Sequence, residues 1–274
     1  MTAHVVAGDV NRSIFFTRLR ADDPLLTAFG LACLMTAALT FALPLIDGRL
    51  IQGVPVWVKP AKFFVSVGVY ALTFAWLTGY VRPERRHVRS LQIGRVMIVG
   101  AGGFELGYIT LQAAFGQASH FNDGDPLHAI LYALMGIMAL TLLASKIPLI
   151  VEIMRRPVHG LEPSLHCAVV LGLTITVVLG AVTGIAISAN DGHSVGATGT
   201  GLPLLGWNQG GGDLRVAHFF GMHGEQILPL FAACLISLGL SRRLLLVTLA
   251  ALLLFGLTIG TWLQAASGIA FPFG

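Results

Sequence analysis

Seven apolar runs, each long enough to cross a bilayer, constrain the fold of this chain more than any other feature. A transmembrane helix needs about 20 predominantly apolar residues, because the hydrocarbon core of a bilayer is about 30 Å thick. Hydrocarbon offers no partner for an unpaired backbone group, so each run must form a helix. The sequence therefore predicts an all-α, polytopic bundle of about seven transmembrane helices, a single transmembrane domain over 1–274. The predicted spans are about 24–46, 60–81, 95–116, 127–150, 165–189, 215–240 and 244–268.

Composition excludes the soluble classes of protein. Hydrophobic residues make up 55% of the 274 residues and charged residues only 11%, whereas a soluble domain carries about 25% charged residues. The chain has no polar low-complexity tract of the kind that stays disordered. Its three cysteines, Cys33, Cys167 and Cys234, lie in apolar runs, which predicts packing roles rather than a disulfide framework.

The basic residues predict the orientation of the chain. Thirteen of the 17 lysines and arginines fall on one side of the predicted spans, Lys146 at the end of the fourth run among them. The positive-inside rule then places the N-terminus in the cytoplasm and the C-terminus outside, as in a multi-pass protein of the inner (cytoplasmic) membrane. Because the basic residues follow the membrane face, they do not indicate nucleic-acid binding. The other side holds Arg49, Lys59, Lys62 and Arg215.

Two further features describe the connections and the helices. The glycine-rich segment 190–214 is predicted as a long outer loop without regular structure. It serves either as a lid or binding loop or as a flexible linker. Pro148 and Pro229 fall inside spans, where proline removes a helical hydrogen bond and predicts a kink.

Ionisable side chains inside the spans are the candidates for function, because they are rare and costly in a membrane. The spacing of Glu105, Tyr108 and Gln112 places them on one stripe of the third span. The helical rise brings Glu105 and Glu225 near the midplane. Other polar residues extend this column toward the outer surface: His128, His218, His223, Gln226 and Gln264.

Two carboxyls near imidazoles predict a cofactor site in the outer half of the bundle. Glu105, Glu225, His218 and His223 would hold a metal ion (Fe, Zn, Cu or Mn), with the two carboxyls as catalytic groups. His128, His218 and His223 would bind haem b instead. We expect the two carboxyls to lie within about 8 Å of each other and to share a cation or a proton. Such a protein would be a membrane-bound oxidoreductase with a small-molecule or redox partner on the outer side.

Two other classes of function fit the same column. A chain of glutamate, histidine and glutamine side chains can carry protons, as in a proton-coupled transporter or carrier. The polar groups can also serve only as hydrogen-bonding contacts between helices, as in a structural or assembly subunit whose partner is the lipid bilayer.

Charged residues at the predicted outer ends of the second and sixth spans have two interpretations. Lys59 and Lys62 share a helical face, and either extend to lipid phosphates or direct a positive charge inward to an anionic ligand or carboxylate. Asp213 and Arg215 are predicted to pair at the entry to the sixth span, a pair worth little if it is exposed to solvent.

Three strings carry a resemblance: WVKPAKF at 57–63, LQAAFGQASHFN at 111–122 and GDLRVAHFFGMHGEQILP at 212–229. Together they resemble a family of uncharacterised bacterial seven-span integral membrane proteins, from the second span through the sixth. The resemblance implies the fold and no activity. It draws attention to a set on or near the outer side: Lys59, Lys62, Gln112, His120, Asn122, Arg215, His218 and His223.

Overall fold

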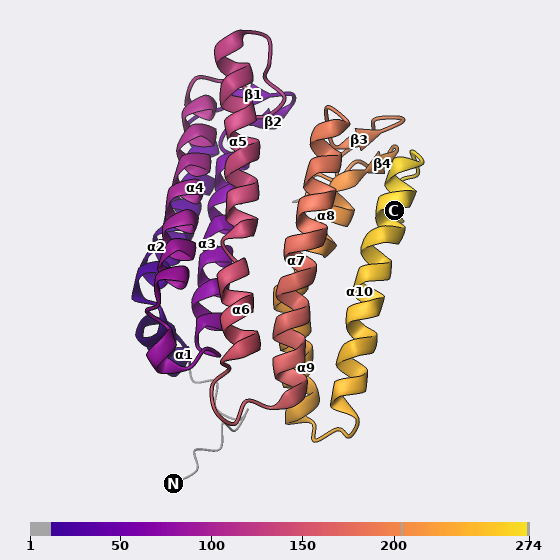
Figure 1. Cartoon of the computed structure of the whole chain (residues 1–274). Coiled ribbons are helices and arrows are strands. Elements are labelled where there is room, and N and C mark those ends of the chain that lie inside the picture. The colour runs from indigo at the N-terminus through magenta and orange to yellow at the C-terminus, as the bar shows by residue number, and fades with distance from the viewer. Residues whose placement is uncertain (1–11, 204, 273–274) are drawn as a thin grey trace. The chain divides into compact units, whose positions relative to one another are not determined.

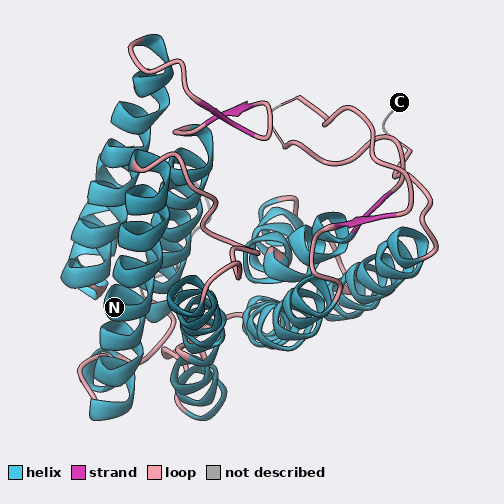
Figure 2. Ribbon diagram, turned by 90° about the horizontal axis from the view of Figure 1, so that it is seen from above, coloured by secondary structure: helices cyan, strands magenta, loops and turns pink. Residues whose placement is uncertain are grey.

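The computed structural model describes residues 12–203 and 205–272, which divide into two compact units. The N-terminal unit comprises the described part of Val10–His159, and the C-terminal unit comprises that of Gly160–Gly274. Each unit is a bundle of helices that lie side by side, seen along their length in Figure 1 and closer to end-on in Figure 2. The predicted assembly of all spans into a single domain stays a prediction.

The N-terminal unit contains six α-helices among its described residues, drawn from indigo to pink in Figure 1. Two short 3₁₀ helices and a two-stranded antiparallel sheet lie in its connections. In chain order its elements are α1 (Arg12–Asp22), α2 (Pro24–Ala42), η1 (Leu43–Leu45), β1 (Leu50–Ile51), β2 (Val54–Pro55), α3 (Val58–Thr78), η2 (Pro83–Arg85), α4 (Arg89–Ala114), α5 (Pro126–Ala144) and α6 (Ile147–Arg155).

The C-terminal unit contains four α-helices among its described residues, drawn in orange and yellow. Its two short strands pair antiparallel, with Ser194 opposite Asp213 and Val195 opposite Gly212. In chain order its elements are α7 (Pro163–Ala189), β3 (Ser194–Val195), β4 (Gly212–Asp213), α8 (Leu214–Met222), α9 (Gly224–Ser237) and α10 (Arg243–Ala266).

Three of the long helices begin with the same local chemistry, an acidic residue followed by proline. Asp23, Asp125 and Glu162 occupy the N-cap positions of α2, α5 and α7, and each carboxylate accepts backbone N–H groups of the first turn. The proline that follows needs no hydrogen bond there and has a backbone angle suited to a helix. These acid–proline pairs fix where each of these three spans begins.

Close packing of α2 against α3 depends on two glycines. A Cβ on Gly30 would lie 2.9 Å from the carbonyl oxygen of Gly68, and one on Gly68 would lie 3.0 Å from that of Gly30. The two backbones therefore touch directly, as small residues permit in membrane helix pairs.

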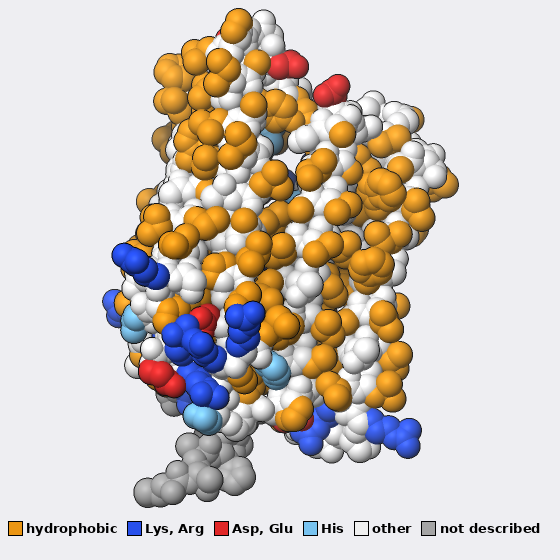
Figure 3. Space-filling model, viewed as in Figure 1, with side chains coloured by type: hydrophobic (Ala, Val, Ile, Leu, Met, Phe, Trp, Pro, Cys, Tyr) orange, Lys and Arg blue, Asp and Glu red, His pale blue; other side chains and the backbone are white. Residues whose placement is uncertain are grey.

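The structure confirms the predicted fold class. Among the described residues, six helical segments are long and apolar enough to cross a membrane, and α8 with α9 makes a seventh if this bent pair is one span. The visible helix surfaces are largely hydrophobic, and basic side chains gather at one end of each unit (Figure 3). The span formed by α5 and α6 has only 11% of its most apolar window buried, so most of that surface is available to lipid.

Three predicted details differ in the structure. The sharp bend of the sixth span is 51° and lies at the break between α8 and α9, at His223 rather than at Pro229. The fourth span is interrupted between α5 and α6 at Ser145 and Lys146, and Pro148 is accommodated in the first turn of α6. The segment 190–214, predicted as an outer loop without regular structure, contains β3 and β4, which pair with each other.

Candidate functional site

A lysine and a histidine meet beside the predicted outer end of α3. Lys59 Nζ lies 3.1 Å from His120 Nδ1, and Ser119 Oγ lies 3.2 Å from the same nitrogen. The rings of Phe63 and Tyr132 flank the imidazole, with centroids 5.6 and 6.3 Å away. We call Lys59, Phe63, Ser119, His120 and Tyr132 the Lys59–His120 cluster. It brings together two residues that the sequence predicted at the outer side.

The electrostatics of this cluster favour a neutral imidazole. Burial, and then the positive charge of Lys59, lower the pKa of His120 from 6.5 to about 3. At neutral pH the ammonium of Lys59 therefore donates to Nδ1, and the ring carries its own proton on Nε2. The charge of Lys59 also acts on Glu105, a buried carboxyl of α4. The inward-facing interpretation of Lys59 is the one that its contacts support.

The predicted stripe on α4 is present. Glu105, Tyr108 and Gln112 are all buried, with 4% of Glu105 exposed. Gln112 Nε2 donates to the Tyr108 hydroxyl at 2.9 Å, while the buried Gln112 Oε1 has no hydrogen-bond partner among the described residues. The stripe therefore presents an acid and an unsatisfied acceptor on one face of the helix.

Three other residues of this unit were predicted near the outer side: Lys62, Asn122 and His128. Lys62 is exposed, as expected of a lysine that extends to lipid phosphates. The Asn122 amide donates to the carbonyl of Ala118 and so holds the loop in which it lies. His128 Nδ1 pairs with the N-cap Asp125, and its Nε2 lies 3.2 Å from Gln117 Oε1. These contacts indicate a structural role for His128 at the start of α5.

The second polar site is the break between α8 and α9. The Met222 carbonyl and the Glu225 amide lose their helical partners there, and one side chain of α7 replaces both. Thr176 Oγ1 donates to the Met222 oxygen at 3.2 Å and accepts from the Glu225 nitrogen at 3.0 Å. A hydroxyl can act in both ways, so the break leaves neither group unpaired.

Close approach of α7 and α9 places Thr176 at the break. A Cβ on Gly172 would lie 2.6 Å from the carbonyl oxygen of Gly224, closer than any side chain allows. Glycine at 172 therefore lets the backbones of α7 and α9 touch, about one helical turn before Thr176. Glu225 lies in the first turn of α9 with 1% of its surface exposed.

Hydrogen bonds link Glu225 to a histidine at the break. Gln226 Nε2 donates to Glu225 Oε1 at 3.1 Å, so its Oε1 is left as the acceptor for His223 Nδ1 at 3.2 Å. The Thr183 hydroxyl donates to the carbonyl of Leu179, so it can only accept from His218 Nδ1, 2.9 Å away. In its neutral form each imidazole therefore carries its proton on Nδ1, which leaves Nε2 as the acceptor of that form.

Arg215 and Gln264, both predicted members of the column, instead bond to residues at one end of the unit, where α8 begins and α10 ends. Arg215 forms a two-pronged ion pair with Asp213, whose side chain is fully buried. Burial tends to raise the pKa of Asp213, but hydrogen bonds from Arg215 and the Asn208 amide outweigh it and lower the pKa below the usual range. The Gln264 amide donates to the carbonyl of Ala270 at 2.7 Å, beyond the end of α10.

Two buried cations of the N-terminal unit were assigned to the cytoplasmic face by sequence reasoning. Lys146 has no exposed surface, and its Nζ lies 3.5 Å from the centre of the Tyr70 ring. Arg95 pairs with the fully buried Asp23 at 2.7 Å, and its two terminal nitrogens have no hydrogen-bond partner among the described residues. The available signal was that both positions fall within the predicted apolar runs.

The predicted metal or haem site has no support in either unit. Among the described residues, no group of three or more His, Cys, Asp or Glu side chains could hold a metal ion. The site predicted to be shared by Glu105 and Glu225 joins residues of the two units and stays a prediction. The three cysteines are free thiols, as expected.

Comparison with protein-family models, curated proteins and solved structures gives no match. The resemblance to a bacterial seven-span family stays a prediction. The helices themselves show an all-α protein whose spans suit a bilayer, with polar groups at a lysine–histidine contact and at a broken helix.

Proposed function

We propose that the protein is a proton-coupled carrier that moves a small solute across the membrane, with Glu225 as the group that takes up and releases the proton. The observation that carries the proposal is a membrane span broken at a buried carboxyl. Broken helices near the midplane form the ion and substrate sites of many transporters, because helix ends and freed backbone groups can bind charged groups.

The depth of the break supports this proposal. Helical rise places Glu225 about 16 Å from Leu214 at one end of the span and about 18 Å from Ser237 at the other, so it lies near the middle. Glu225 is in the first turn of α9, where the helix dipole favours a negative charge. Intramembrane carboxyls that face a polar neighbour serve in the proton relays of pumps and transporters.

Two histidines of the same unit support a route for the proton. His218 and His223 lie on α8 and at its end, between Glu225 and the predicted outer side. In the neutral rings Nε2 can take up a proton, and Gln226 connects His223 to the carboxyl by hydrogen bonds. A bound metal ion would instead need several ligands in one place, for which the described residues offer no group.

Proton movement in reconstituted vesicles tests the proposal. The purified protein is inserted into vesicles that contain a pH-sensitive dye, and solutes of one class at a time (amines, carboxylates, amino acids, sugars) are added outside. We expect at least one class to change the interior pH, and Glu225→Gln to abolish that change. Glu84→Gln, the same substitution at an exposed residue of η2, is the matched control and should behave as wild type.

Two results would contradict the proposal. The first is a Glu225→Gln variant that moves protons with the solute as fast as wild type. The second is a correctly inserted protein that moves no protons with any class and that purifies with stoichiometric metal or haem. The second result would favour the membrane-bound oxidoreductase that the sequence suggested.

A further inference from the structure

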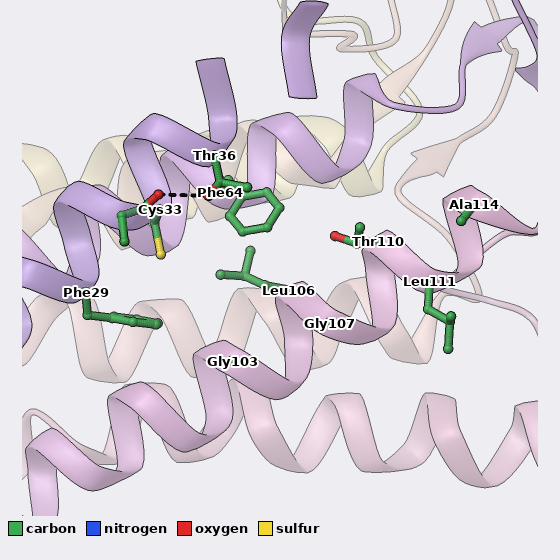
Figure 4. Close-up of a pocket in the computed structure, with 11 residues that line it drawn as sticks. Phe29, Cys33, Thr36, Phe64, Gly103, Leu106, Gly107, Thr110, Leu111 and Ala114 are labelled. Atoms are coloured by element: carbon green, nitrogen blue, oxygen red, sulfur yellow. Dashed lines mark hydrogen bonds between the residues drawn. The ribbon is translucent and has the colours of Figure 1, made fainter. Parts of the chain in front are cut away.

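A groove on the N-terminal unit is independent of the proposed transport site. It lies between α2, α3 and α4 and has a volume of about 560 Å³. Its walls include Phe29 and Thr36 on α2, Phe64 on α3, and Gly103, Gly107 and Thr110 on α4, as Figure 4 shows. A volume of this size lies within the range of about 300–1,000 Å³ that small-molecule sites occupy.

The groove exists because two glycines of α4 do not pack against the bundle. A Cβ on Gly103 or Gly107 would meet nothing within 4 Å. Gly102, the neighbour of Gly103, does pack against the bundle, since a Cβ added there would lie 3.0 Å from the side chain of Val67. The space beside Gly103 and Gly107 is thus unfilled by the protein itself.

One polar group in this apolar groove lacks a partner. The Thr110 hydroxyl is buried and has no hydrogen-bond partner among the described residues, and in Figure 4 it points into the groove. A buried hydroxyl without a partner is costly, so an acceptor supplied by a ligand would stabilise it.

Other threonines on the helices show that this orientation is a departure from the usual one. Ten of them donate to the carbonyl oxygen four residues earlier, which satisfies the hydroxyl within the helix. Thr110 makes no such bond with Leu106. The ten are Thr27, Thr36, Thr40, Thr78, Thr141, Thr174, Thr183, Thr248, Thr258 and Thr261.

The length and depth of the groove match one leaflet of a bilayer. Along α4 it extends from Gly103 to Ala114, which is about 16 Å of helix, and half of the hydrocarbon core is about 15 Å. Thr110 lies about 6 Å from the end of α4 at Ala114. A helix as long as α4 projects slightly beyond the hydrocarbon at each end, so Thr110 lies close to the level of the lipid headgroups.

We propose that this groove binds one acyl chain of a phospholipid of the outer leaflet, and that Thr110 donates a hydrogen bond to the ester carbonyl of that chain. The hydroxyl of Thr36 is already bonded to Ala32, so Thr110 supplies the polar contact and Phe29 and Phe64 contact the chain. A polar solute would find one donor in an apolar channel, which disfavours it.

Phospholipid retention tests the site. Wild-type protein and variants are purified in a mild detergent with a phosphatidylethanolamine that carries palmitoyl and oleoyl chains, and native mass spectrometry counts the retained phospholipid. We expect Gly107→Leu to fill the groove and lose one phospholipid that wild type keeps. Gly136→Leu, at an exposed glycine of α5 that also meets nothing within 4 Å, is the matched control and should keep it.

A second variant removes only the donor. Thr110→Val has nearly the same shape and should weaken retention by about three- to tenfold, the effect of one hydrogen bond. Thr141→Val, at a partly exposed threonine of α5 that is outside the groove, should have no effect. If Gly107→Leu fails to fold, the comparison of Thr110→Val with Thr141→Val still tests whether the groove binds the phospholipid.

Three results would overturn the proposal. Equal retention by wild type, Gly107→Leu and Thr110→Val would show that the groove holds no phospholipid. Binding of an isoprenoid quinone but not of the phospholipid, sensitive to Gly107→Leu, would identify a different occupant. A change from oligomer to monomer in Gly107→Leu would show that a second copy of the chain fills the groove.

Discussion

The two units each contain an interrupted membrane helix, and the two interruptions are stabilised differently. In the N-terminal unit the break between α5 and α6 is closed mainly by nearby residues of the same chain segment, and Tyr70 of α3 adds one hydrogen bond to the Leu142 carbonyl. The Ser145 and Lys146 amides donate to carbonyls three or four residues earlier, and the Ser145 hydroxyl donates to Leu142. In the C-terminal unit the break between α8 and α9 depends on Thr176, almost fifty residues earlier in the chain.

This difference decides which break is bent. A break closed by local hydrogen bonds keeps the direction of the helix, and α5 with α6 counts as one continuous span. A break closed by a neighbouring helix can adopt whatever angle that neighbour sets, and α8 meets α9 at 51°. A site that must change during transport is better placed at the second kind of break, because movement of α7 would alter it directly.

The two units also differ in how they treat buried charge. The N-terminal unit buries an ion pair, Asp23 with Arg95, and places Lys146 over an aromatic ring. The C-terminal unit also buries the Asp213 carboxylate, but its partner Arg215 is partly exposed. The polar site at the break between α8 and α9 consists of hydroxyl, amide, imidazole and one carboxyl. Removing one side chain should therefore be most costly in the N-terminal unit.

Loss of the buried ion pair should have the largest effect on stability. Asp23→Asn keeps an oxygen that can cap α2 but leaves Arg95 buried without its counter-charge, which costs about 3–5 kcal/mol. Hydrogen exchange measured peptide by peptide should show faster exchange in α2 and α4, with α7 and α9 unchanged. Asp22→Asn, at a partly exposed pair with Arg86, should cost about 1 kcal/mol or less. Equal effects of both variants would show that burial of Asp23 has no special weight.

Loss of the Thr176 hydroxyl should have the second largest effect on stability. It tests whether the break between α8 and α9 differs from the break between α5 and α6. Thr176→Val leaves the Met222 carbonyl and the Glu225 amide unpaired, which costs about 2–4 kcal/mol, and Thr176→Ser should restore most of it. Ser145→Ala should cost about 1 kcal/mol or less, since Leu142 still accepts from the Tyr70 hydroxyl. Chemical unfolding in detergent measures both. Similar losses for Thr176→Val and Ser145→Ala would remove the distinction between the breaks.

The sequence predicted what depends on local composition. The apolar runs identified the spans, and the spacing of Glu105, Tyr108 and Gln112 placed them on one stripe, which is buried in the structure. Each of these features depends on neighbours along the chain, which a sequence shows directly.

Contacts between distant segments could not be read in the same way. Pro229 suggested a kink because it removes one hydrogen bond, but the bend forms at His223, where Gly172 allows α7 to touch Gly224. Lys146 follows the positive-inside pattern, yet the break at Ser145 lets it lie over Tyr70. The sequence of the loop 190–214 indicated no regular structure, because the order of this loop comes from single side chains. The side-chain amide of Asn208, for example, donates to the Ala197 carbonyl and accepts from the backbone N–H groups of Gly199 and Gly210.

The smallest expected effect is a difference in acid sensitivity between the two units. His120 is neutral when folded, because its pKa falls from 6.5 to about 3. Its stabilising contribution is complete above about pH 6.5 and is lost as the pH falls toward about 3, since the unfolded chain then binds the proton. Asp213 has a folded pKa below 3.8, so its contribution is lost only under more acidic conditions.

Between about pH 6 and pH 4, therefore, protonation of His120 in the unfolded chain should weaken the N-terminal unit, while Asp213 keeps the loop 190–214 of the C-terminal unit protected. Lys59 and Tyr132 face His120 from α3 and α5, and the fixed charge of Lys59 keeps the protonated imidazole unfavourable across this range. Hydrogen exchange, corrected for the intrinsic pH dependence of amides, measures the loss around 115–125. His120→Gln should flatten that loss, and His87→Gln, at an exposed histidine of the same unit, should leave it unchanged. A slope that survives in His120→Gln would assign the acid sensitivity to another group and remove this difference between the units.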